Sequence, residues 1–390
     1  MERMKIELKN FDDGEIIKFG GEYYMFKLNS FNGNPVVKPE DLGLVWQDKD
    51  EVKIGAVFNG GADIFDNKVI LTPRCHRGYY KTKWFDPKLG FERTILENYI
   101  SEVWMLESED GINFKVRDDV VIKGDGTEHG DFMYGIEDIR IIKTKGKYLL
   151  ILIGCGKVKP PFKGENADRV AIYSTEDFNK IEYHGIISSF DSRNAILLEH
   201  DKGYYMFLRF HPNIYLVKFD DLDVLLEPKV NKEFWDNVYE HKERYFFLGI
   251  GDYPHEKEKI GPGTQLILTN EGWLFIYHAV GRIDKEICRQ YGLNEGIDRG
   301  YSVNIALLDY DNPARIIARS KFPFYIPGKP YELYGDTDYP VDVPAVVFPM
   351  GAFAIENKLF IYAGSGDKYE ILLSCDVEML VDFMCRYYRR

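Results

Sequence analysis

The sequence predicts an all-β protein, a five-bladed β-propeller that ends in a short C-terminal helix. Aromatic residues are abundant, with 27 Tyr, 26 Phe and 5 Trp among 390 residues, and many lie in short runs bounded by Gly, Asp, Asn or Pro. Such runs are typical of strands joined by tight turns. A strand-and-turn unit also recurs along the chain, and helical periodicity is scarce before the C-terminus. These three observations carry the prediction of the fold class.

Eight segments have the composition and length of β-strands. They are residues 68–74, 99–108, 147–155, 169–175, 203–210, 272–280, 301–309 and 358–365. At the C-terminus, apolar side chains recur at helical spacing instead, namely Met379, Leu380, Phe383 and Met384. We therefore expect one terminal helix over residues 376–390, packed on its own domain.

The recurring unit consists of a strand, a cluster of Ser or Asp, a polar turn and an apolar residue. It reads LESEDGINF at 106–114 and IYSTEDFNKI at 172–181, and it is weaker at 216–225 and 307–317. Because no βαβ alternation accompanies it, the repeat indicates a propeller or a sandwich, and we favour the propeller. A pair of β-sandwich domains is the alternative. No Pro- or Ser-rich linker divides the chain, so we expect one domain over residues 1–390.

Five blades in 390 residues leave about 78 residues for each blade, well above the ~40–45 residues of a compact blade repeat. Several blades must therefore carry long connections. The candidates are residues 76–98, 155–168 and 228–262, which are rich in Lys, Pro, Gly and Glu.

Charge and cysteine usage exclude several classes of protein. The chain has 63 acidic and 50 basic residues, for a net charge of −13, which disfavours binding of nucleic acid over a broad basic face. No window approaches the ~18 apolar residues of a membrane span. The five cysteines are scattered, and the eight histidines show neither HxxxH nor HxH spacing. We expect a soluble, cytoplasmic protein with free thiols and no metal site.

Residues 134–142, YGIEDIRII, place two carboxyl groups and a guanidinium group before an apolar stretch. If a strand starts here, alternation sends Asp138 and Arg140 to one side and Glu137 to the other. An Asp and an Arg on one side form either a functional site or an ordinary ion pair. From the residues alone, the ion pair is the commoner explanation.

Residues 191–210 hold Arg193 before one apolar run and Arg209 at the end of the next. If the two runs form a hairpin around the turn at 200–203, the two arginines lie side by side. Adjacent guanidinium groups repel each other unless an anion lies between them, and Arg binds phosphate or carboxylate oxygens in a bidentate manner. A bound oxyanion and a neighbouring Asp or Glu explain the pair equally well.

Residues 257–280 contain a Gly-Pro-Gly turn, a hairpin through 270–272, and His278 beside Tyr277. No GK[ST] follows the Gly-Pro-Gly, so the turn is not a phosphate-binding P-loop. A single His in an apolar strand is more often a core residue than a catalytic one.

Taken together and in this order, these segments resemble the mannoside phosphorylases and related enzymes of glycoside hydrolase family 130, which are five-bladed β-propellers. The resemblance covers residues 55–370. The family motifs include F-N-x-G-A with a later Arg, S-x-D-G-x-x-F, G-x-E-D-P-R, R-N-x-x-L-x-P-E with a later Arg, G-W-L-x-x-Y-H and Y-Y-G-x-x-D. The matching residues here are Asn59, Gly60, Gly61, Ala62 and Arg74; Ser108, Asp110, Gly111 and Phe114; Gly135, Glu137, Asp138 and Arg140; Arg193, Asn194, Leu197, Glu199 and Arg209; Gly272, Trp273, Leu274, Tyr277 and His278; and Tyr362, Gly364 and Asp367. Ile139 and Leu198 stand where the family motifs have proline.

The resemblance implies a role for each candidate residue. Asp138 is implied to be the general acid. The implied phosphate-binding residues are Arg193, Arg209 and His278, with Lys259 as a weaker candidate. The implied substrate-binding residues are Asn59, Arg74, Arg140, Tyr277 and Asp367.

The reaction that the resemblance implies is an inverting phosphorolysis of β-mannosides to α-mannose 1-phosphate and an acceptor sugar. Inorganic phosphate is the co-substrate, no cofactor is needed, and Asp138 passes its proton through a hydroxyl of the mannosyl unit. Two alternatives are a β-mannoside hydrolase of the same family and a non-catalytic glycan-binding propeller. The expected partners are an oligosaccharide and phosphate, without nucleic acid or membrane, and assembly into a homo-oligomer is left open.

Two further expectations concern the surroundings of Asp138. A general acid must be protonated at the working pH; burial or a bound phosphate raises a carboxyl pKa, whereas a neighbour such as Arg140 lowers it.

Residues 75–98 and 228–258 depart from the family pattern, and we expect both to lie over the propeller face and to shape the acceptor site.

Overall fold

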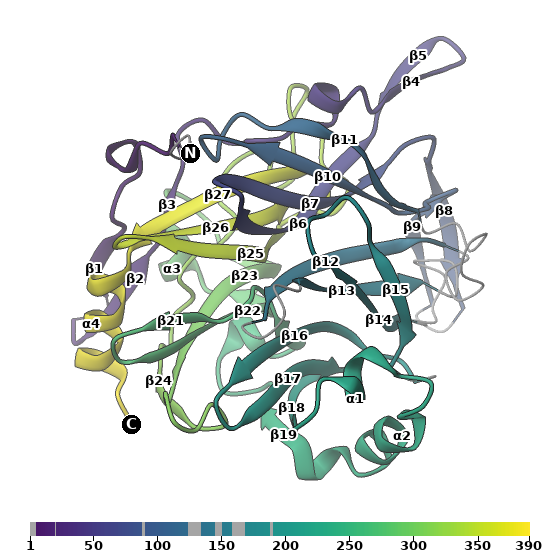
Figure 1. The fold of residues 1–390 in the computed structure, drawn as a ribbon. Coiled ribbons are helices and arrows are strands. Elements are labelled where there is room, and N and C mark those ends of the chain that lie inside the picture. The colour runs from purple at the N-terminus through teal and green to yellow at the C-terminus, as the bar shows by residue number, and fades with distance from the viewer. Residues whose placement is uncertain are drawn as a thin grey trace.

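Five antiparallel sheets lie around a central axis in the computed structural model (Figure 1). The structure describes residues 5–19, 21–87, 90–123, 134–144, 150–157, 168–187 and 190–390. Each of the five sheets has four or five strands, and neighbouring sheets contact one another around the axis. The fold is the five-bladed β-propeller that the sequence predicts.

The blades follow one another in chain order, and each is named here by its place in that order. Blade 1 consists of β6 (Ala56–Phe65), β7 (Lys68–His76), β10 (Glu102–Ser108) and β11 (Lys115–Lys123). Blade 2 consists of β12 (Ile136–Lys143), β13 (Leu150–Lys157), β14 (Asp168–Thr175) and β15 (Glu182–Ile186). Blade 3 consists of β16 (Arg193–His200), β17 (Gly203–Phe210), β18 (Asn213–Phe219) and β19 (Phe246–Leu248).

Blades 4 and 5 complete the ring. Blade 4 consists of β20 (Lys259–Pro262), β22 (Gly272–Ile283), β23 (Ile297–Leu308) and β24 (Ile316–Arg319), with β21 (Ile267–Thr269) also paired to β22. Blade 5 consists of β25 (Val347–Ile355), β26 (Lys358–Ser365), β27 (Tyr369–Asp376) and the N-terminal β3 (Asn29–Ser30). Because β3 pairs with β27, the two ends of the chain close the ring by hydrogen bonding within one sheet.

Three two-stranded hairpins and several short helices lie outside the blades. The hairpins are β1 (Glu15–Phe19) with β2 (Tyr23–Lys27), β4 (Val45–Asp48) with β5 (Glu51–Ile54), and β8 (Tyr80–Asp86) with β9 (Phe91–Glu97). The α-helices are α1 (Asp223–Leu226), α2 (Lys232–Glu240), α3 (Lys285–Arg289) and α4 (Val377–Tyr388). The short 3-10 helices are η1 (Leu8–Asn10), η2 (Pro39–Leu42), η3 (Lys242–Tyr245) and η4 (Pro254–Glu256).

The predicted strands are confirmed where the structure describes them. Seven of the eight segments fall within β7, β10, β14, β17, β22, β23 and β26, apart from up to three residues at their ends. The eighth, 147–155, begins outside the described residues and continues as β13. The expected hairpins through 200–203 and 270–272 are also present, since His200 pairs with Gly203 and Thr269 pairs with Gly272.

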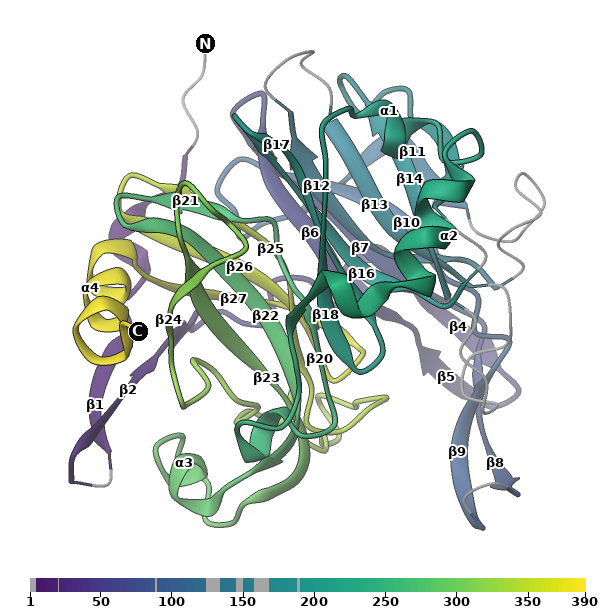
Figure 2. The ribbon, with the colours of Figure 1, turned by 90° about the horizontal axis from the view of Figure 1, so that it is seen from below.

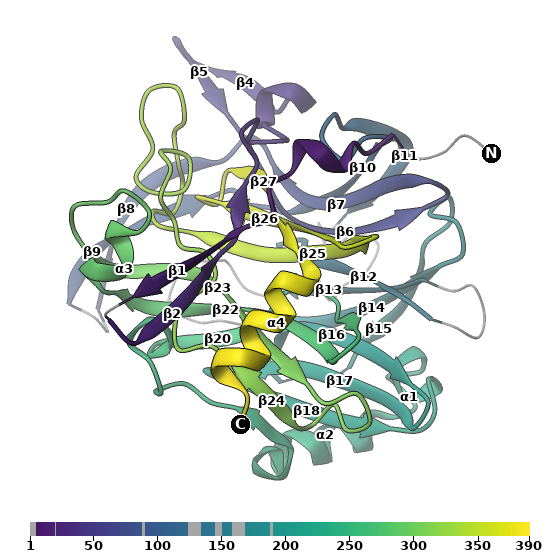
Figure 3. The ribbon, with the colours of Figure 1, turned by 90° about the vertical axis from the view of Figure 1, so that its left-hand side faces the viewer.

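The terminal helix is confirmed as α4. Asp376 caps its N-terminus by accepting a hydrogen bond of 2.8 Å from the Met379 amide. Leu380, Phe383 and Met384 are buried against residues of blades 4 and 5. Figure 3 shows α4 lying across the outer side of these blades, so the helix packs on its own propeller as expected.

The two segments that were expected over the propeller face take different positions. Residues 75–98 form the β8–β9 hairpin, which extends beyond the blades (Figure 2), and Lys81 at its base pairs with Asp342 at 2.7 Å. Within residues 228–258, helix α2 does not lie over the face. It buries Trp235 and Val238 in the apolar layer between blades 2 and 3, because this amphipathic segment finds its nearest apolar surface there.

The innermost strands of blades 1, 2 and 3 share one irregularity. Their registers shift at Asn59, Asp138 and Asn194, which have positive φ values of 56°, 57° and 55°. A left-handed residue in a strand produces a bulge that redirects side chains, and Asn and Asp tolerate this conformation better than other non-glycine residues. The propeller therefore presents three equivalent polar side chains near its axis.

Candidate active site

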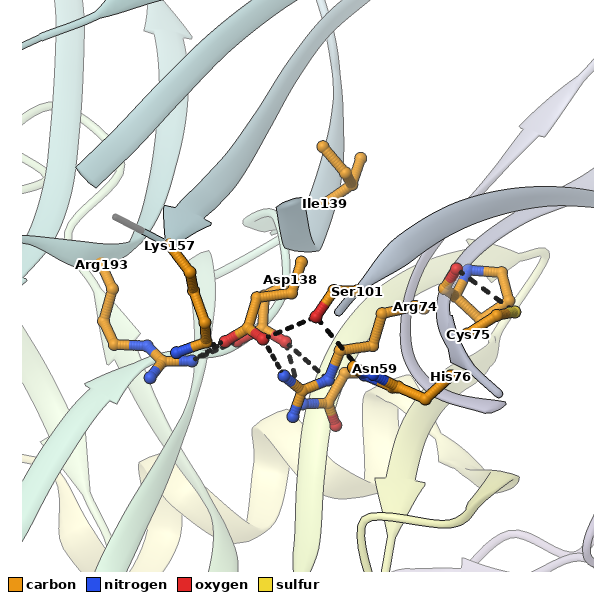
Figure 4. Close-up of polar contacts among 12 residues, drawn as sticks. Asn59, Arg74, Cys75, His76, Ser101, Asp138, Ile139, Lys157 and Arg193 are labelled. Carbon is orange, nitrogen blue, oxygen red and sulfur yellow. Dashed lines mark hydrogen bonds and ion pairs between the residues drawn. The ribbon is translucent and has the colours of Figure 1, made fainter. Parts of the chain in front are cut away.

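Asp138 lies at the centre of a buried polar cluster near the start of β12. Its side chain is fully buried. The Asn59 amide donates a hydrogen bond of 2.9 Å to Oδ1, and Arg193 donates one of 2.9 Å to Oδ2 (Figure 4). The Arg74 Nε lies 3.6 Å from Oδ1. The bulges of β6 and β12 thus bring together residues that are 79 positions apart in the sequence.

Glu137 faces the same cluster, which corrects the expectation from strand alternation. Arg193 Nη2 lies 2.8 Å from Glu137 and 2.9 Å from Asp138, so adjacent carboxyl groups converge on one guanidinium nitrogen. The register shift after Glu137 removes the regular alternation. Glu137 also pairs with Arg74, and it lies 3.2 Å from Lys157 and accepts a hydrogen bond of 3.2 Å from Ser101. All of its charge is therefore balanced inside the protein.

A third carboxylate, Asp168, completes the network. Lys157 and Asp168 are paired residues of β13 and β14, with Nζ and Oδ1 3.0 Å apart. Arg193 Nη1 lies 3.1 Å from the other oxygen of Asp168. Burial disfavours the charged carboxylate, but Lys157 and Arg193 outweigh it and lower the pKa of Asp168. Sequence reasoning missed Lys157, Asp168 and Ser101; the pairing of Lys157 with Asp168 is visible only once the hairpin register is known.

Arg193 and Arg209 are direct cross-strand partners, as the predicted hairpin requires. Both Nη groups of Arg193 contact carboxylates, whereas the Nε atoms of Arg193 and Arg209 have no hydrogen-bond partner in the described part of the chain. Arg209 is buried, and its burial together with the charge of Arg193 lowers its pKa to about 10. A buried, poorly compensated guanidinium group is a strong candidate to bind an anion.

Two further buried side chains of this region lack hydrogen-bond partners. Both ring nitrogens of the fully buried His278 and both amide atoms of Asn194 lack partners among the described residues. Gly261 pairs with His278, and a Cβ on Gly261 would lie 2.5 Å from the His278 ring and 3.2 Å from Arg209, so the chain passes close to both side chains. Asn194 matches the family motif but was not among the predicted site residues; its unsatisfied amide and its bulge position now single it out.

Electrostatics support an anion site here. Burial, together with the charges of Arg209 and Lys259, holds the pKa of His278 well below its usual value. Burial also lowers the pKa of Lys259, whose ammonium group lies 5.0 Å from the ring centre of Tyr301. Each of these shifts reports excess positive charge in a region with little water, which a bound oxyanion would relieve.

Asp367 occupies the turn after β26, also at a positive φ of 50°. Burial raises its pKa to about 6, although Arg74 opposes the shift, and the neighbouring charges of Asp342 and Asp138 raise the pKa further. The structure therefore brings Asp367 into the same electrostatic cluster as Arg74 and Asp138.

Two predicted substrate residues are held by other contacts. Arg140 donates to the backbone carbonyls of Gly263 (2.8 Å), Asp138 (2.9 Å) and Pro262 (3.1 Å), and so ties β12 to β20. Tyr277 donates a hydrogen bond of 2.8 Å to Glu256. It follows that Tyr277 lies in a different buried cluster from its neighbour His278, as alternation along β22 requires. A role for either residue in substrate binding stays a prediction.

The ionisation of Asp138 is decided by its neighbours. Burial favours the protonated form, but the charges of three arginines outweigh it and hold the pKa of Asp138 well below its usual value. These are Arg74, Arg193 and Arg140. In the absence of a bound anion, Asp138 is therefore a carboxylate that accepts hydrogen bonds and has no proton to donate.

The described residues hold neither a cluster of metal-binding side chains nor a membrane-spanning helix. They contain no group of three or more His, Cys, Asp or Glu side chains arranged to hold a metal ion. Among the helices that the structure describes, none is long and apolar enough to span a membrane. The five cysteines are all free.

Comparison with known proteins identifies the relatives of this chain. A 1,2-β-oligomannan phosphorylase from Thermoanaerobacter sp. (strain X514) is 27% identical over 345 residues, which cover 88% of this chain and 95% of that protein. A β-1,2-mannobiose phosphorylase from the same organism is 26% identical and covers 88% of this chain and 96% of that protein. The structure of β-1,2-mannobiose phosphorylase from Listeria innocua, in complex with β-1,2-mannobiose, superimposes with a TM-score of 0.64 at 18% identity, covering 92% of this chain and 99% of that one.

The family assignment rests on most of the chain. Residues 33–386 match the model of glycoside hydrolase family 130, which is described as beta-1,4-mannooligosaccharide phosphorylase. The match includes every strand of the five blades except β3, and the whole cluster around Asp138. This chain therefore belongs to glycoside hydrolase family 130.

Proposed function

We propose that this protein is an inverting β-mannoside phosphorylase that forms α-mannose 1-phosphate and releases an acceptor sugar. The observation that carries the proposal is the set of unsatisfied donors beside Asp138. Arg209, His278 and Asn194 offer buried nitrogen groups without acceptors, within a region of excess positive charge. Inorganic phosphate supplies the oxygen atoms and the negative charge that this set lacks.

Phosphate binding also explains how Asp138 acquires its proton. In the free protein, Arg193 donates to Asp138 and helps to keep it ionised. A phosphate on Arg209 and Arg193 adds negative charge and competes for the guanidinium group, and both effects raise the pKa of Asp138. Asp138 then becomes a general acid only when the nucleophile is in place.

The proposed reaction balances in protons. The bond between the anomeric carbon and the glycosidic oxygen breaks, and a phosphate oxygen bonds to the anomeric carbon from the opposite face. The proton of Asp138 passes to the leaving oxygen, through a hydroxyl of the mannosyl unit. The proton of hydrogen phosphate restores the acid, and positioning of the anion rather than a general base supplies the nucleophile.

Hydrolysis by the same site is the weaker alternative. An inverting hydrolase needs a free carboxylate base to activate water. Glu137, which is adjacent in sequence, is paired with Arg74 and Arg193 and lies 3.2 Å from Lys157. This carboxylate is engaged by cations and is poorly suited to act as a base.

For the linkage, we favour a β-1,2-mannoside. The two Thermoanaerobacter relatives, which match nearly nine-tenths of the chain, are named for β-1,2-linked substrates. The family model is named for a β-1,4-mannooligosaccharide, so both linkages belong in the test.

The test is incubation of the protein with β-1,2- and β-1,4-linked mannosides, with and without inorganic phosphate. We expect α-mannose 1-phosphate only when phosphate is present. Free mannose that forms regardless of phosphate would establish the hydrolase. Binding of the glycans without turnover would favour the non-catalytic propeller.

A further inference from the structure

Glu370 is a fully buried carboxyl group near the active site that the proposed mechanism does not use. It lies on β27, with no exposed surface. Its Oε2 accepts a hydrogen bond of 3.0 Å from the backbone amide of Gly60, the residue that follows Asn59 in the β6 bulge. Its Oε1 has no partner among the described residues.

The surroundings of Glu370 connect blade 5 to this bulge. Glu370 pairs with Gly364 on β26, and a Cβ on Gly364 would lie only 1.9 Å from Oδ1 of Asn59. The Asn59 side chain is therefore fitted directly against blade 5, beside the residue that pairs with Glu370. On the other side, the Glu370 backbone exchanges hydrogen bonds with Val36 and Val37 of the N-terminal segment. Glu370 thus lies where the ring closes.

The ionisation of Glu370 fits a structural acceptor. Burial raises its pKa well above the usual value, the hydrogen bond from Gly60 opposes this shift, and the charge of Asp138 adds to it. Burial therefore favours the neutral acid form of Glu370. A neutral carboxyl accepts the Gly60 amide without adding a negative charge beside Asp138.

We propose that Glu370 is a positioning residue, which fixes the β6 bulge through the Gly60 amide and so holds the Asn59 amide against Asp138. The left-handed conformation of Asn59 is uncommon for a non-glycine residue, and it persists only where its surroundings hold it in place. Glu370 and the bare backbone of Gly364 supply that support from blade 5. The kinetic part of the test rests on the proposed function; the structural part does not.

The test compares Glu370→Ala, which removes the acceptor, with Glu370→Gln, which keeps an uncharged acceptor of the same shape. Amide hydrogen exchange of residues 56–62 is measured by mass spectrometry on the whole protein. We expect exchange in this segment to become about tenfold faster in Glu370→Ala and to stay unchanged in Glu370→Gln. Equal exchange in Glu370→Ala and the wild-type protein would overturn the inference. If Glu370→Ala does not fold, Glu370→Met, which fills the space without an acceptor, carries the same expectation.

Kinetics then separate positioning from mere stabilisation. Without a fixed Asn59, Asp138 loses a hydrogen bond to its ionised form, so the alkaline limb of the kcat/KM profile moves to higher pH while kcat falls about tenfold. Glu370→Gln is expected to retain wild-type rates and the wild-type profile. The double variant Glu370→Ala/Asn59→Ala is expected to be no slower than Asn59→Ala, because both changes remove the same contact. Additive losses, or equal damage by Gln and Ala, would contradict the proposal.

Glu332 provides a matched control. It is fully buried and accepts hydrogen bonds from the Tyr325 hydroxyl and from the Gly328 and Lys329 amides, at 2.7 to 2.8 Å. Glu332→Ala is expected to lower stability without changing exchange in residues 56–62 or the pH profile. If no mannoside is turned over by the wild-type protein while the exchange result holds, the proposed function fails and the role of Glu370 in fixing the bulge stands.

Discussion

The strands β6 and β12 carry a buried carboxylate at each end, and the two ends behave in opposite ways. Near the start of the strands, Asn59 contacts Asp138; near their ends, Asp63 pairs with Lys143 at 2.6 Å. Burial raises the pKa of Asp63, and the single lysine does not overcome it. At Asp138 the charges of three arginines do overcome it. Two buried carboxyl groups therefore have pKa shifts of opposite sign, and the number of nearby cations decides the sign.

The candidate active site differs from the opposite end of these strands in its balance of buried charges. At Asp63, the cation that pairs with the carboxyl group is one half-exposed lysine, Lys143. At the other end, the protein concentrates more buried cations than its own carboxylates neutralise, and Arg209 is left over. The excess costs stability in the free protein and is useful only if an anion binds.

The sharpest way to separate the two ends is to replace each carboxylate with an amide. Asp138→Asn removes the proposed acid, so we expect kcat to fall by about 10²–10⁴-fold, the usual contribution of a general acid. Asp63→Asn, which alters the other end of the same strands, is expected to stay within about twofold of the wild-type rate. Steady-state kinetics with saturating phosphate measures both. An active Asp138→Asn variant would end the assignment of Asp138.

The next largest effect is expected at the excess cation. Arg209→Ala removes a bidentate donor, so the KM for phosphate should rise about 10- to 100-fold with a smaller change in the affinity for the mannoside. Lys143→Ala is the control at the opposite end and should leave the phosphate KM unchanged. An Arg209→Ala variant with wild-type phosphate dependence would refute the anion site.

Phosphate binding should also change the protonation of the protein. The pKa of Asp138 is low in the free protein, and an adjacent anion raises it, so binding takes up protons wherever the pH lies between the two values. We expect up to about one proton from Asp138. Calorimetry in buffers of different ionisation enthalpy measures the uptake between about pH 5 and 8, and Asp138→Asn corrects for the proton equilibria of phosphate itself. Identical uptake by the two proteins would show that Asp138 does not respond to phosphate.

The smallest expected effect is on stability, and its sign differs between the two ends. The folded pKa of Asp63 is raised, so ionisation opposes folding, and stability falls as the pH rises from the unfolded pKa through the folded one. Asp63→Asn should therefore raise the free energy of unfolding at pH 7 by up to about 1 kcal/mol. The pKa of Asp138 is lowered in the folded state, so its ionised form contributes to the free energy of unfolding at pH 7, and this contribution is lost as the pH falls. Asp138→Asn should therefore lower the free energy of unfolding at pH 7. Urea unfolding at pH 7 and pH 4 checks both signs.

The sequence predicted the parts of this site that depend on regular structure. The side-by-side placement of Arg193 and Arg209 followed from one hairpin, and β17 and β22 were visible as apolar runs. The innermost strands were harder to recognise, because Asn59, Asp138 and Asn194 interrupt them with bulges. Alternation counted through a bulge gives the wrong face, which is why Glu137 was placed away from Asp138.

Other features depend on contacts between distant segments. Nothing near Lys157 in the sequence indicates that it meets both Asp168 and Glu137, since this requires the register of blade 2. The ionisation of Asp138 also depends on Arg74 from another blade. Tyr277 illustrates the opposite case: its separation from His278 follows from period-two alternation, and the sequence alone contains that information.

The closure of the ring by β3 and β27 has a consequence for synthesis of the protein. Gly60 meets Glu370, 310 residues later in the chain, and the β6 bulge has no support from blade 5 until that residue is made. A ribosome that has translated the first four blades, with the proposed acid and the proposed anion-binding arginines, has not yet produced the strand that supports this bulge. Removal of β27 would therefore be expected to loosen a bulge encoded 310 residues upstream of Glu370.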